Sequence, residues 1–421
     1  MPRASDRQLP QVPRIAPQPW MTAPQTRKLL KAMKAGDAAA RFVGGAVRDA
    51  LLGRPVADVD IATPAPPETV LALLKKARIK AVPTGIEHGT VTAVISPRHF
   101  EITTLRRDVE TFGRHARVAF TDDWRADAER RDFTMNALFL DADGTIHDYV
   151  GGLDDLQARR VRFVGDAETR IREDVLRLLR FYRFHAQIER GSADENARAA
   201  CRALASLLPT LSAERVAAEL MKLLAAPDPL PTLVLMAVDE VLPVLLPEAV
   251  RPDRLEALIA IDPATDPLRR LAALVDVDAA GAVALAERLR LSNQDRDRLA
   301  AMAAPEWPLE LDGGAEAQRR ALHHLGPARY ADLVLLRAAA AGPATRKRAR
   351  ALLAAAEKTE LPEFPLKGRD VTALGIDAGP RIGALLAELE TWWEEGDFKA
   401  TRKACLAELK RRVGERSSRE R

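Results

Sequence analysis

The spacing of hydrophobic residues divides the chain into two regions. From about Arg41 to Val150, apolar residues occur in short runs separated by turn-forming residues, a pattern that predicts strands and few helices. After Gly151 the chain is rich in Leu, Ala and Arg and keeps a helical periodicity almost to its end. The predicted strands are RFVGG, ADVDIAT, TVTAVIS and FEITTLR, and NALFL-DADG-TIHDYV is typical of a hairpin across an Asp-Gly turn.

Prolines subdivide the helical region. A cluster between Pro227 and Pro247 predicts short helices, and the basic, proline-flanked segment near residues 342–365 predicts a further boundary. We therefore expect an α+β fold, in which a mixed head is followed by helical domains. The predicted limits are a disordered lead-in at 1–20, a head at 21–150, and helical segments at 151–225, 226–342 and 343–421.

Composition narrows the class of protein. A chain of 421 residues is too long for one core, and 47% apolar with 29% charged residues is typical of a folded protein. The net charge is only +4, but basic residues crowd the C-terminus and the segment from Arg159 to Arg190. These runs fit either a polyanionic partner or a solvated surface.

Cysteines and apolar runs exclude several other classes. Only Cys201 and Cys405 are present, too few for a disulfide framework or a cysteine zinc site. No apolar run is long enough to span a bilayer, so we expect no membrane partner. The proline-rich N-terminus lacks the apolar core of a signal peptide, which predicts a cytoplasmic protein.

A glycine pair marks the first candidate site. Gly44 and Gly45 follow a predicted strand and precede a helical stretch over Ala46–Leu52. Glycine lets backbone N–H groups approach a phosphate closely, and a helix N-terminus favours an anion. Arg48 in the first helical turn could add a bidentate phosphate contact. A tight turn before an ordinary helix would have the same local pattern.

Two aspartates follow at strand spacing. Residues two apart in a strand share a face, so Asp58 and Asp60 are expected to bring their carboxylates together. Such like charges are costly without a cation, and hard oxygen ligands suit Mg²⁺, which then also binds substrate phosphates. Glu101 would supply a third carboxylate if its strand were a neighbour. Two exposed aspartates on an edge strand are the plain alternative.

A predicted helix over Ala167–Gln187 carries a polar face opposite an apolar stripe. Asp174, Arg177, Arg180 and Arg183 recur every three residues along this face. Cytosine and adenine both present an amino donor beside a ring-nitrogen acceptor, which one carboxylate and one guanidinium can match. Uracil and guanine reverse that order and would leave buried polar groups unpaired. The alternative is a solvated face with one ion pair, from Asp174 to Arg177.

The ordered motifs resemble a known family. GGAVRDALLGRPVADVDIAT, DAERRDFTMNALF and HDYVGGLDDLQARRVRFVGDAETRIREDVLRLLRFYRF are similar to signatures of class II tRNA nucleotidyltransferases, the CCA-adding enzymes, a class shared with bacterial poly(A) polymerases. The resemblance runs from about residue 20 to 225 and includes LSAERVAAELMKLL. A weaker likeness continues through LRLSNQDRDRL and PLKGRDVTALGIDAGPRIGALL.

The resemblance implies a fold and an activity. The fold would be a polymerase-β-like nucleotidyltransferase head followed by an all-α neck, body and tail. The activity would be template-independent addition of C, C and A to the 3′ end of tRNA, with CTP and ATP as substrates, Mg²⁺ as cofactor and pyrophosphate as product. The body and tail would bind tRNA through its backbone shape.

The resemblance also assigns roles to residues. Asp58 and Asp60 would hold the metal and, with Glu101, form the catalytic group. Asp174 and Arg177 would select the base. The nucleotide-binding residues would be Gly44, Gly45, Arg48, Asp49, Arg130, Arg131, Asp174, Arg177, Arg180 and Arg183. Asp127 and Asp132 are expected to be structural partners of Arg130 and Arg131. A polar loop at 106–118 resembles the family's flexible loop, although an ordinary surface loop would look the same.

Three other functions remain open at this level. A poly(A) polymerase shares every head motif, a CC-only or A-only adding enzyme is a close relative, and a catalytically silent RNA-binding protein is a distant alternative. The complete set of Asp58, Asp60 and Arg48 argues against the last. His323 and His324 lie in a Leu- and Ala-rich helix and are more typical of a surface or core position than of a metal site.

Overall fold

The chain folds into two compact units, Met1–Pro247 and Glu248–Arg421. The computed structural model describes residues 13–112, 115–189, 191, 193–360, 362–377 and 379–419, without the side chains of residues 84, 108–112, 115–118 and 416–419. The first twelve residues of the predicted lead-in, the centre of the predicted loop at residues 113 and 114, and the last two basic-tail residues lie outside this part.

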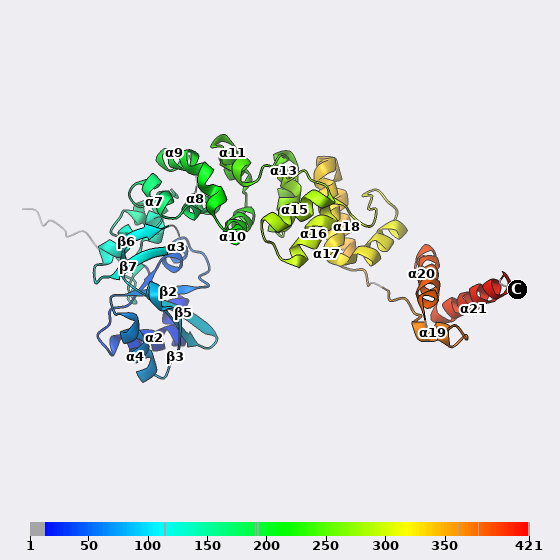
Figure 1. Ribbon diagram of the computed structural model, residues 1–421, viewed down its shortest axis with the longest axis horizontal. Helices are drawn as coiled ribbons and strands as arrows, with labels where there is room; N and C mark the ends of the chain where they lie inside the picture. Colours follow the sequence, from blue (N-terminus) through cyan, green and yellow to red (C-terminus); the bar gives the residue numbers. More distant parts are fainter. Residues whose placement is uncertain are drawn as a thin grey trace, which may run out of the picture. The chain divides into compact units, whose positions relative to one another are not determined.

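A seven-stranded mixed sheet forms the centre of the head in the first unit (Figure 1). Its strand order is β3-β4-β5-β2-β1-β8-β9, and β2 pairs parallel with β5 while the other neighbours are antiparallel. The strands are β1 (Arg41–Val43), β2 (Val59–Thr63), β3 (Lys80–Gly85), β4 (Thr90–Ile95), β5 (Arg98–Thr104), β8 (Phe139–Leu140) and β9 (Ile146–His147). The parallel pair is what brings residues of β2 and β5 side by side.

Most of the predicted strands are present. The hairpin across the Asp-Gly turn is β8–β9, where Phe139 pairs with His147. The sequence did not predict β3, whose Pro83 is compatible only with an edge strand, and β3 lies at the edge of the sheet.

A second, two-stranded sheet occupies the place of the predicted polar loop. The strands β6 (Arg106–Phe112) and β7 (His115–Phe120) pair antiparallel, with Arg106 opposite Phe120. Polar composition suggested a loop here, but the segment also contains Val, Thr and Phe, which favour strands. The prediction of a loop was therefore wrong for the described part of this segment.

The end of the predicted lead-in is held against the head. The N–H of Ile15 donates to the carbonyl of Gly144 at 2.9 Å, and the N–H of Ile146 donates to the carbonyl of Pro13 at 2.9 Å. These bonds extend the β8–β9 hairpin, and Trp20 then packs edge-on against Phe42 with ring centroids 4.8 Å apart. Residues 13–20 are thus ordered.

Helices pack around the sheet of the head, and the chain after the sheet is helical. In the head, α3 follows β1 directly, and α2 packs against α4. The helices of the first unit are α1 (Pro19–Thr22), α2 (Pro24–Lys34), α3 (Gly45–Leu51), α4 (Pro67–Lys76), α5 (Trp124–Glu129), α6 (Gly152–Gln157), α7 (Ala167–Glu173), α8 (Leu176–Ile188), α9 (Glu195–Leu204), α10 (Ala213–Leu224), α11 (Leu230–Val238) and α12 (Val241–Leu245). Short 3₁₀ turns are η1 (Ile86–His88), η2 (Thr134–Asn136), η3 (Ala205–Thr210) and η4 (Pro343–Thr345).

The predicted helix over Ala167–Gln187 is interrupted. Asp174 has φ −151° and ψ 106°, an extended conformation that separates α7 from α8. Aspartate disfavours helix interiors because its carboxylate bonds nearby backbone N–H groups. Here it accepts from the N–H of Leu176 at 3.2 Å. The prediction of one continuous helix was wrong. Of the expected apolar stripe of Ile171, Val175, Leu178, Leu179 and Tyr182, Val175 is half-buried and the other four side chains are buried.

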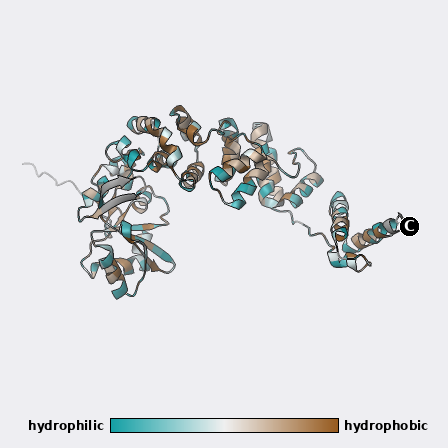
Figure 2. Cartoon of the chain, in the orientation of Figure 1, coloured by the Kyte–Doolittle hydropathy of each residue, from teal (hydrophilic) through white to brown (hydrophobic). Residues whose placement is uncertain are grey.

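The second unit is helical throughout its described part. Its longest element, α17, contains a kink at Gly326, where φ is 69° and ψ is 165°, just before Pro327. Hydrophobic and hydrophilic residues share the same helices in both units (Figure 2), as expected for amphipathic helices. The helices are α13 (Pro252–Ile259), α14 (Pro267–Leu274), α15 (Ala279–Arg288), α16 (Asn293–Ala303), α17 (Ala315–Ala341), α18 (Arg346–Ala356), α19 (Gly368–Thr372), α20 (Pro380–Glu395) and α21 (Arg402–Arg419).

Candidate active site

The turn between β1 and α3 is the first part of the site. Gly44 precedes α3 with φ 70°, a backbone conformation that residues other than glycine rarely adopt. A Cβ at Gly44 would lie 3.7 Å from Nη1 of Arg131, so this turn faces an arginine from a distant segment. The turn therefore presents backbone and guanidinium donors in one place.

Arg48 is held in a fixed orientation. Its Nε and Nη2 each donate to the carboxylate of Asp49 at 2.9 Å, and its Nη1 donates to Oδ1 of Asn136 at 2.8 Å. The guanidinium also lies 4.9 Å from the ring centre of Phe184 on α8. Asp49, predicted to bind nucleotide, is thus the ion-pair partner of Arg48 in this structure.

The strand pairing places the carboxylates. Asp58 lies just before β2 and is exposed, whereas Asp60 lies within β2 and is half-buried. The parallel register aligns Asp60 with Glu101 on β5, so the neighbour relationship on which Glu101 depended is present. Burial, the Glu101 carboxylate and, less strongly, Asp58 raise the pKa of Asp60 to about 6, while Arg131 lowers it.

The carboxylates of Asp58, Asp60 and Glu101 do not by themselves surround a metal ion. Among the described residues, the one group of three metal-ligating side chains with ligand atoms all within 4.8 Å is elsewhere, at His323, Glu390 and Glu394. Asp58, Asp60 and Glu101 do not close into a cage of that kind. Mg²⁺ usually takes one or two carboxylates and completes its shell with water and phosphate oxygens, so an open set fits it.

A buried aspartate positions the next two arginines. Asp127 is 1% exposed and accepts from Nε of Arg130 at 2.8 Å and from Nη2 of Arg131 at 2.9 Å. Burial alone would raise the pKa of Asp127, but Arg131 and Arg130 together lower it. Asp127 is therefore the predicted partner of both arginines.

Asp132 has a different partner from the one predicted. It accepts from Nε of Arg180 at 2.8 Å, from the amide of Asn136 at 3.1 Å, and from the N–H of Phe133. Against the effect of burial, Arg180 and these hydrogen bonds lower the pKa of Asp132 to about 2. Asp132 thus links α8 to the head, because the side chain that it holds is on α8.

Both candidate base-reading side chains have partners in the same unit. The carboxylate of Asp174 accepts from Nη2 of Arg215 on α10 at 2.7 Å. Arg177 pairs with Glu173, not with Asp174, and also donates to the carbonyl of Arg170 at 3.1 Å. The alternative of an Asp174–Arg177 ion pair is therefore wrong, since the break before α8 separates the two groups.

Arg180 and Arg183 surround one aromatic ring. The guanidinium carbons of Arg183, Arg180 and Arg48 lie 3.9, 5.4 and 4.9 Å from the ring centre of Phe184. Arg183 also forms an ion pair with Glu219 on α10 at 2.5 Å. Burial lowers the pKa of Arg183, and the nearby Arg180 and Arg48 lower it further, while Glu219 opposes them.

Sequence reasoning missed several of these supports. Phe184, Glu173, Arg215 and Glu219 were not singled out, although the first two lie within a quoted motif and the others within LSAERVAAELMKLL. Glu173 and Phe184 lie four residues from Arg177 and Arg180, respectively, which was the available signal. Arg215 and Glu219 are distant in sequence from every residue already chosen. Only tertiary contacts show which charged partner each one has.

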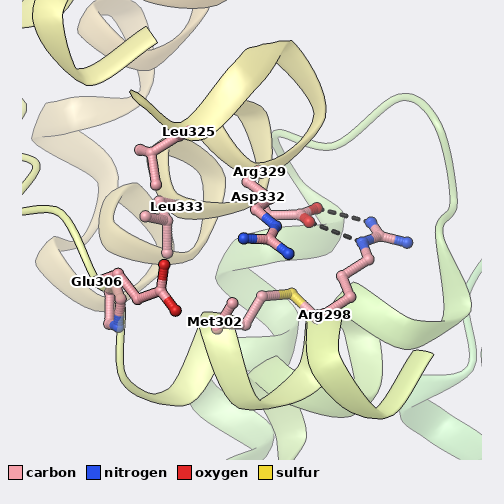
Figure 3. A pocket seen from close by; sticks show the side chains of 9 residues that line it. Arg298, Met302, Glu306, Leu325, Arg329, Asp332 and Leu333 are labelled. Carbon is pink, nitrogen blue, oxygen red and sulfur yellow. Dashed lines mark hydrogen bonds and ion pairs between the residues drawn. The ribbon is translucent and has the colours of Figure 1, made fainter. Parts of the chain in front are cut away.

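A pocket in the second unit is unrelated to these groups (Figure 3). Arg298 lines it and donates to both oxygens of Asp332 at 2.7 Å. Asp332 also accepts from Arg269 at 2.8 Å. The polar side chains of Arg298 and Asp332 are consequently engaged in holding α16, α14 and α17 together.

Within the described part of the chain, no helix combines the length and the apolar character that crossing a membrane requires.

Comparisons with known proteins agree with the architecture. Residues 40–162 match the family described as "Poly A polymerase head domain", and residues 192–251 match "Probable RNA and SrmB- binding site of polymerase A". The chain is 34% identical over 384 residues to "CCA tRNA nucleotidyltransferase 1, mitochondrial" of Danio rerio, covering 88% of this chain and 86% of that protein. It is 44% identical over 190 residues to the "CCA-adding enzyme" of Geobacillus stearothermophilus, covering 45% and 46%.

Solved structures show the same fold. The "Crystal structure of Bacillus stearothermophilus CCA-adding enzyme in complex with CTP" matches 94% of this chain and all of that chain, with a TM-score of 0.73 and 29% identity. The "Thermotoga maritima CCA-adding enzyme complexed with tRNA_CCA" matches 92% and 94%, with a TM-score of 0.64 and 20% identity, which supports the fold alone. The family resemblance inferred from the motifs is confirmed: this chain belongs to the class II CCA tRNA nucleotidyltransferase and poly(A) polymerase family.

Proposed function

We propose that this chain adds C, C and A to the 3′ end of tRNA, using CTP and ATP and releasing pyrophosphate. The observation that carries the proposal is similarity to proteins named CCA tRNA nucleotidyltransferase over 88% of the chain, so that neck and body are included along with the head. The head motifs alone would fit a poly(A) polymerase equally well.

We propose Mg²⁺ as the cofactor, held by Asp58 and Asp60 with Glu101 beside them. Two features support this choice. The register sets Asp60 directly beside Glu101, and burial together with this neighbouring carboxylate raises the pKa of Asp60; a bound cation would relieve the repulsion. Bound Mg²⁺ would activate the RNA 3′-hydroxyl and neutralise charge on the α-phosphate.

The other residues would act by positioning. Arg48 and the Gly44–Gly45 backbone are proposed to hold the triphosphate, since Arg48 is already fixed by Asp49 and Asn136. Arg130 and Arg131, anchored on Asp127, would add contacts to the ribose or triphosphate. Such transfer requires little covalent chemistry from a protein, so fixed positive groups around the phosphates are the expected contribution.

Base selection is proposed for Asp174 and Arg177. An incoming C or A would donate its amino group to Asp174 and accept from Arg177. Both side chains are half-buried and held by Arg215 and Glu173, which fixes their direction at the junction of α7 and α8. A pair held in this way discriminates because a wrong base leaves buried polar groups unpaired.

The remaining helices are proposed to bind tRNA, with a body over 226–342 and a tail over 343–421. A cytoplasmic location stays a prediction, and the relative of Danio rerio is named as mitochondrial.

One experiment separates the activities. A tRNA that ends at its discriminator base is offered to the protein with CTP, with ATP, or with both. CCA addition gives two added residues with CTP and three with both nucleotides. A long ladder of products with ATP alone would indicate a poly(A) polymerase. A stop after two added residues would indicate a CC-only enzyme, and a stop after one would indicate an A-only enzyme. No extension at all would indicate a silent RNA-binding protein.

A further inference from the structure

Three metal-ligating side chains meet in the second unit, far along the chain from the head carboxylates. They are His323 on α17 and Glu390 and Glu394 on α20, and one ligand atom from each lies within 4.8 Å of the others. Among the described residues this is the one such group.

The local sequence explains the convergence. Glu390 and Glu394 are four residues apart on α20, so they share a face. His323 lies three residues before the kink at Gly326, in the first half of α17, and this half contacts α20 through His323 and Glu394. Nearby, Arg319 on α17 pairs with Asp397, two residues after the end of α20, through two hydrogen bonds of 2.8 and 2.6 Å. This pair ties the C-terminal end of α20 to α17 beside the cluster.

The three ligand atoms are spaced widely enough to admit an ion between them. Nε2 of His323 and Oε1 of Glu394 are 3.8 Å apart, too far for a hydrogen bond. Two ligands of a tetrahedral ion with bonds of about 2.1 Å lie about 3.4 Å apart. No hydrogen bond or ion pair is recorded for the half-buried Glu390 among the described residues, which leaves its carboxylate available.

A second layer of contacts orients the buried ligand. His324 Nε2 lies 2.7 Å from Oε2 of Glu394, and the His324 ring stacks on Trp307 with centroids 3.6 Å apart. Glu394 is 6% exposed, so its free oxygen is directed by this contact toward His323. Protein metal sites commonly hydrogen-bond their carboxylate ligands in this way.

We propose that His323, Glu390 and Glu394 bind a divalent transition-metal ion, Zn²⁺, that joins α20 to the first half of α17. One imidazole and two carboxylates suit Zn²⁺, with water in the fourth position, and the ion balances the two negative charges. The site is separate from the head carboxylates, and the proposal goes beyond the proposed function. A plain helix–helix contact, held by His324 and Glu394 alone, would instead be indifferent to metal.

The test uses the full chain without a histidine tag, in millimolar Mg²⁺ so that the head carboxylates are saturated. Zn²⁺ is delivered from a chromophoric chelator of known affinity, and the thermal midpoint is measured with and without Zn²⁺. Four proteins are compared: the wild type, His323→Ala, Glu390→Gln, and the control Glu395→Gln, which alters an exposed glutamate on the same helix.

The wild type and Glu395→Gln should bind one equivalent of Zn²⁺ and melt at a higher temperature with it. His323→Ala and Glu390→Gln should bind at least tenfold more weakly and lose that rise. Nucleotide addition with Mg²⁺ should stay unchanged in Glu390→Gln, which shows that the fold is intact. Absence of Zn²⁺ binding by the wild type, or equal binding by all four proteins, would overturn the proposal.

Discussion

Individual residues in the head show how surroundings reverse the chemistry of one side chain. Asp60 and Asp132 are both partly or fully shielded from water, yet the pKa of Asp60 is raised to about 6 and that of Asp132 is lowered to about 2. The neighbours account for the difference, because Asp60 faces Glu101 while Asp132 accepts from Arg180. Asp60, whose pKa stays raised despite the nearby Arg131, is the carboxylate suited to receive a metal ion.

Replacement of Asp60 by Asn should abolish nucleotide addition and stabilise the metal-free protein. The raised pKa means that the stabilising contribution of protonated Asp60 is present below about pH 4 and is lost as the pH rises through about 6. At pH 7.5, Asp60→Asn should therefore be more stable than the wild type by up to about 3 kcal/mol. The measurement is the thermal midpoint in EDTA at pH 5 and pH 7.5, and the gap should narrow at pH 5.

Asp58→Asn is the matched control for this prediction. Asp58 is exposed, so the substitution should reduce nucleotide addition without a comparable gain in stability. Binding of tRNA should remain near wild type in both variants. An Asp60→Asn protein that keeps more than a tenth of the wild-type rate would remove the metal-binding role.

Among the secondary-structure elements, two interruptions of helices determine how nearby side chains are placed. Asp174 sits in extended backbone between α7 and α8, and Gly326 bends α17 between its two halves. A continuous helix would have pointed Asp174 and Arg177 along one face as mutual partners. Because of the break, Asp174 pairs with Arg215 and Arg177 pairs with Glu173, and both side chains lie beside the junction of α7 and α8.

Asp174→Ala should damage base choice more than chemistry. Each hydrogen bond to a charged group contributes roughly 1.5–3 kcal/mol, which corresponds to about a ten- to hundredfold change in relative rates. CTP and ATP addition should slow while discrimination against UTP and GTP weakens. Competition among all four nucleotides on tRNA lacking CCA measures this. Glu168→Ala, an exposed change on α7, is the control and should leave the ratios unchanged; unchanged ratios in Asp174→Ala itself would remove the base-selection role.

Gly326→Ala tests the kink in α17. With φ 69° and ψ 165°, this backbone conformation is essentially restricted to glycine and costs another residue about 1–3 kcal/mol. A Cβ there would meet nothing within 4 Å, so the loss would come from the backbone alone. Gly383→Ala, within α20 and equally open, should be neutral or stabilising by up to about 1 kcal/mol. Equal melting of the two variants in thermal unfolding would contradict a rigid kink.

Across the whole molecule, the numerous basic residues are almost balanced by acidic residues, so the net charge is only +4. Much of the positive charge near the C-terminus is paired internally, as in Arg402 with Asp370 and Arg411 with Glu408. Lys403 and Lys410 on α21 are exposed and have no recorded ion pair among the described residues. These two lysines are accordingly better candidates for RNA phosphate contacts than the more numerous arginines.

The affinity for tRNA should fall steeply as salt rises, because phosphate contacts release counterions. Charge reversal of Lys403 and Lys410 to Glu should weaken binding and reduce the slope of log affinity against log salt by about one per lost contact. Reversal of Lys28, exposed on α2 of the head, is the control and should leave the slope near wild type. Filter binding at a series of KCl concentrations gives the slopes. A flat wild-type dependence would assign the basic runs to solvated surface.

Local sequence determined the division into a mixed head and a helical remainder, the hairpin at β8–β9 and the choice of candidate residues. These features depend on hydrophobic period, turn chemistry and short motifs, which are local properties of the chain. The edge strand β3 and the β6–β7 hairpin were not predicted from the sequence. Proline and polar residues disfavour a strand locally, and these strands form because they pair with neighbouring strands. The single helix expected over Ala167–Gln187 failed for a related reason, since Asp174 bonds the backbone locally.

Tertiary structure alone decided which charges meet. The sequence could place Asp60 and Glu101 on strands, but only the tertiary structure buries Asp60 and, through the parallel register of β2 and β5, sets it beside Glu101. Burial and this neighbour raise the pKa of Asp60. Likewise, nothing local shows that Asp132 would hold Arg180 or that Arg215 would hold Asp174. Electrostatic interactions depend on distance in space and on burial, whereas sequence spacing reports distance only within one strand or one helix.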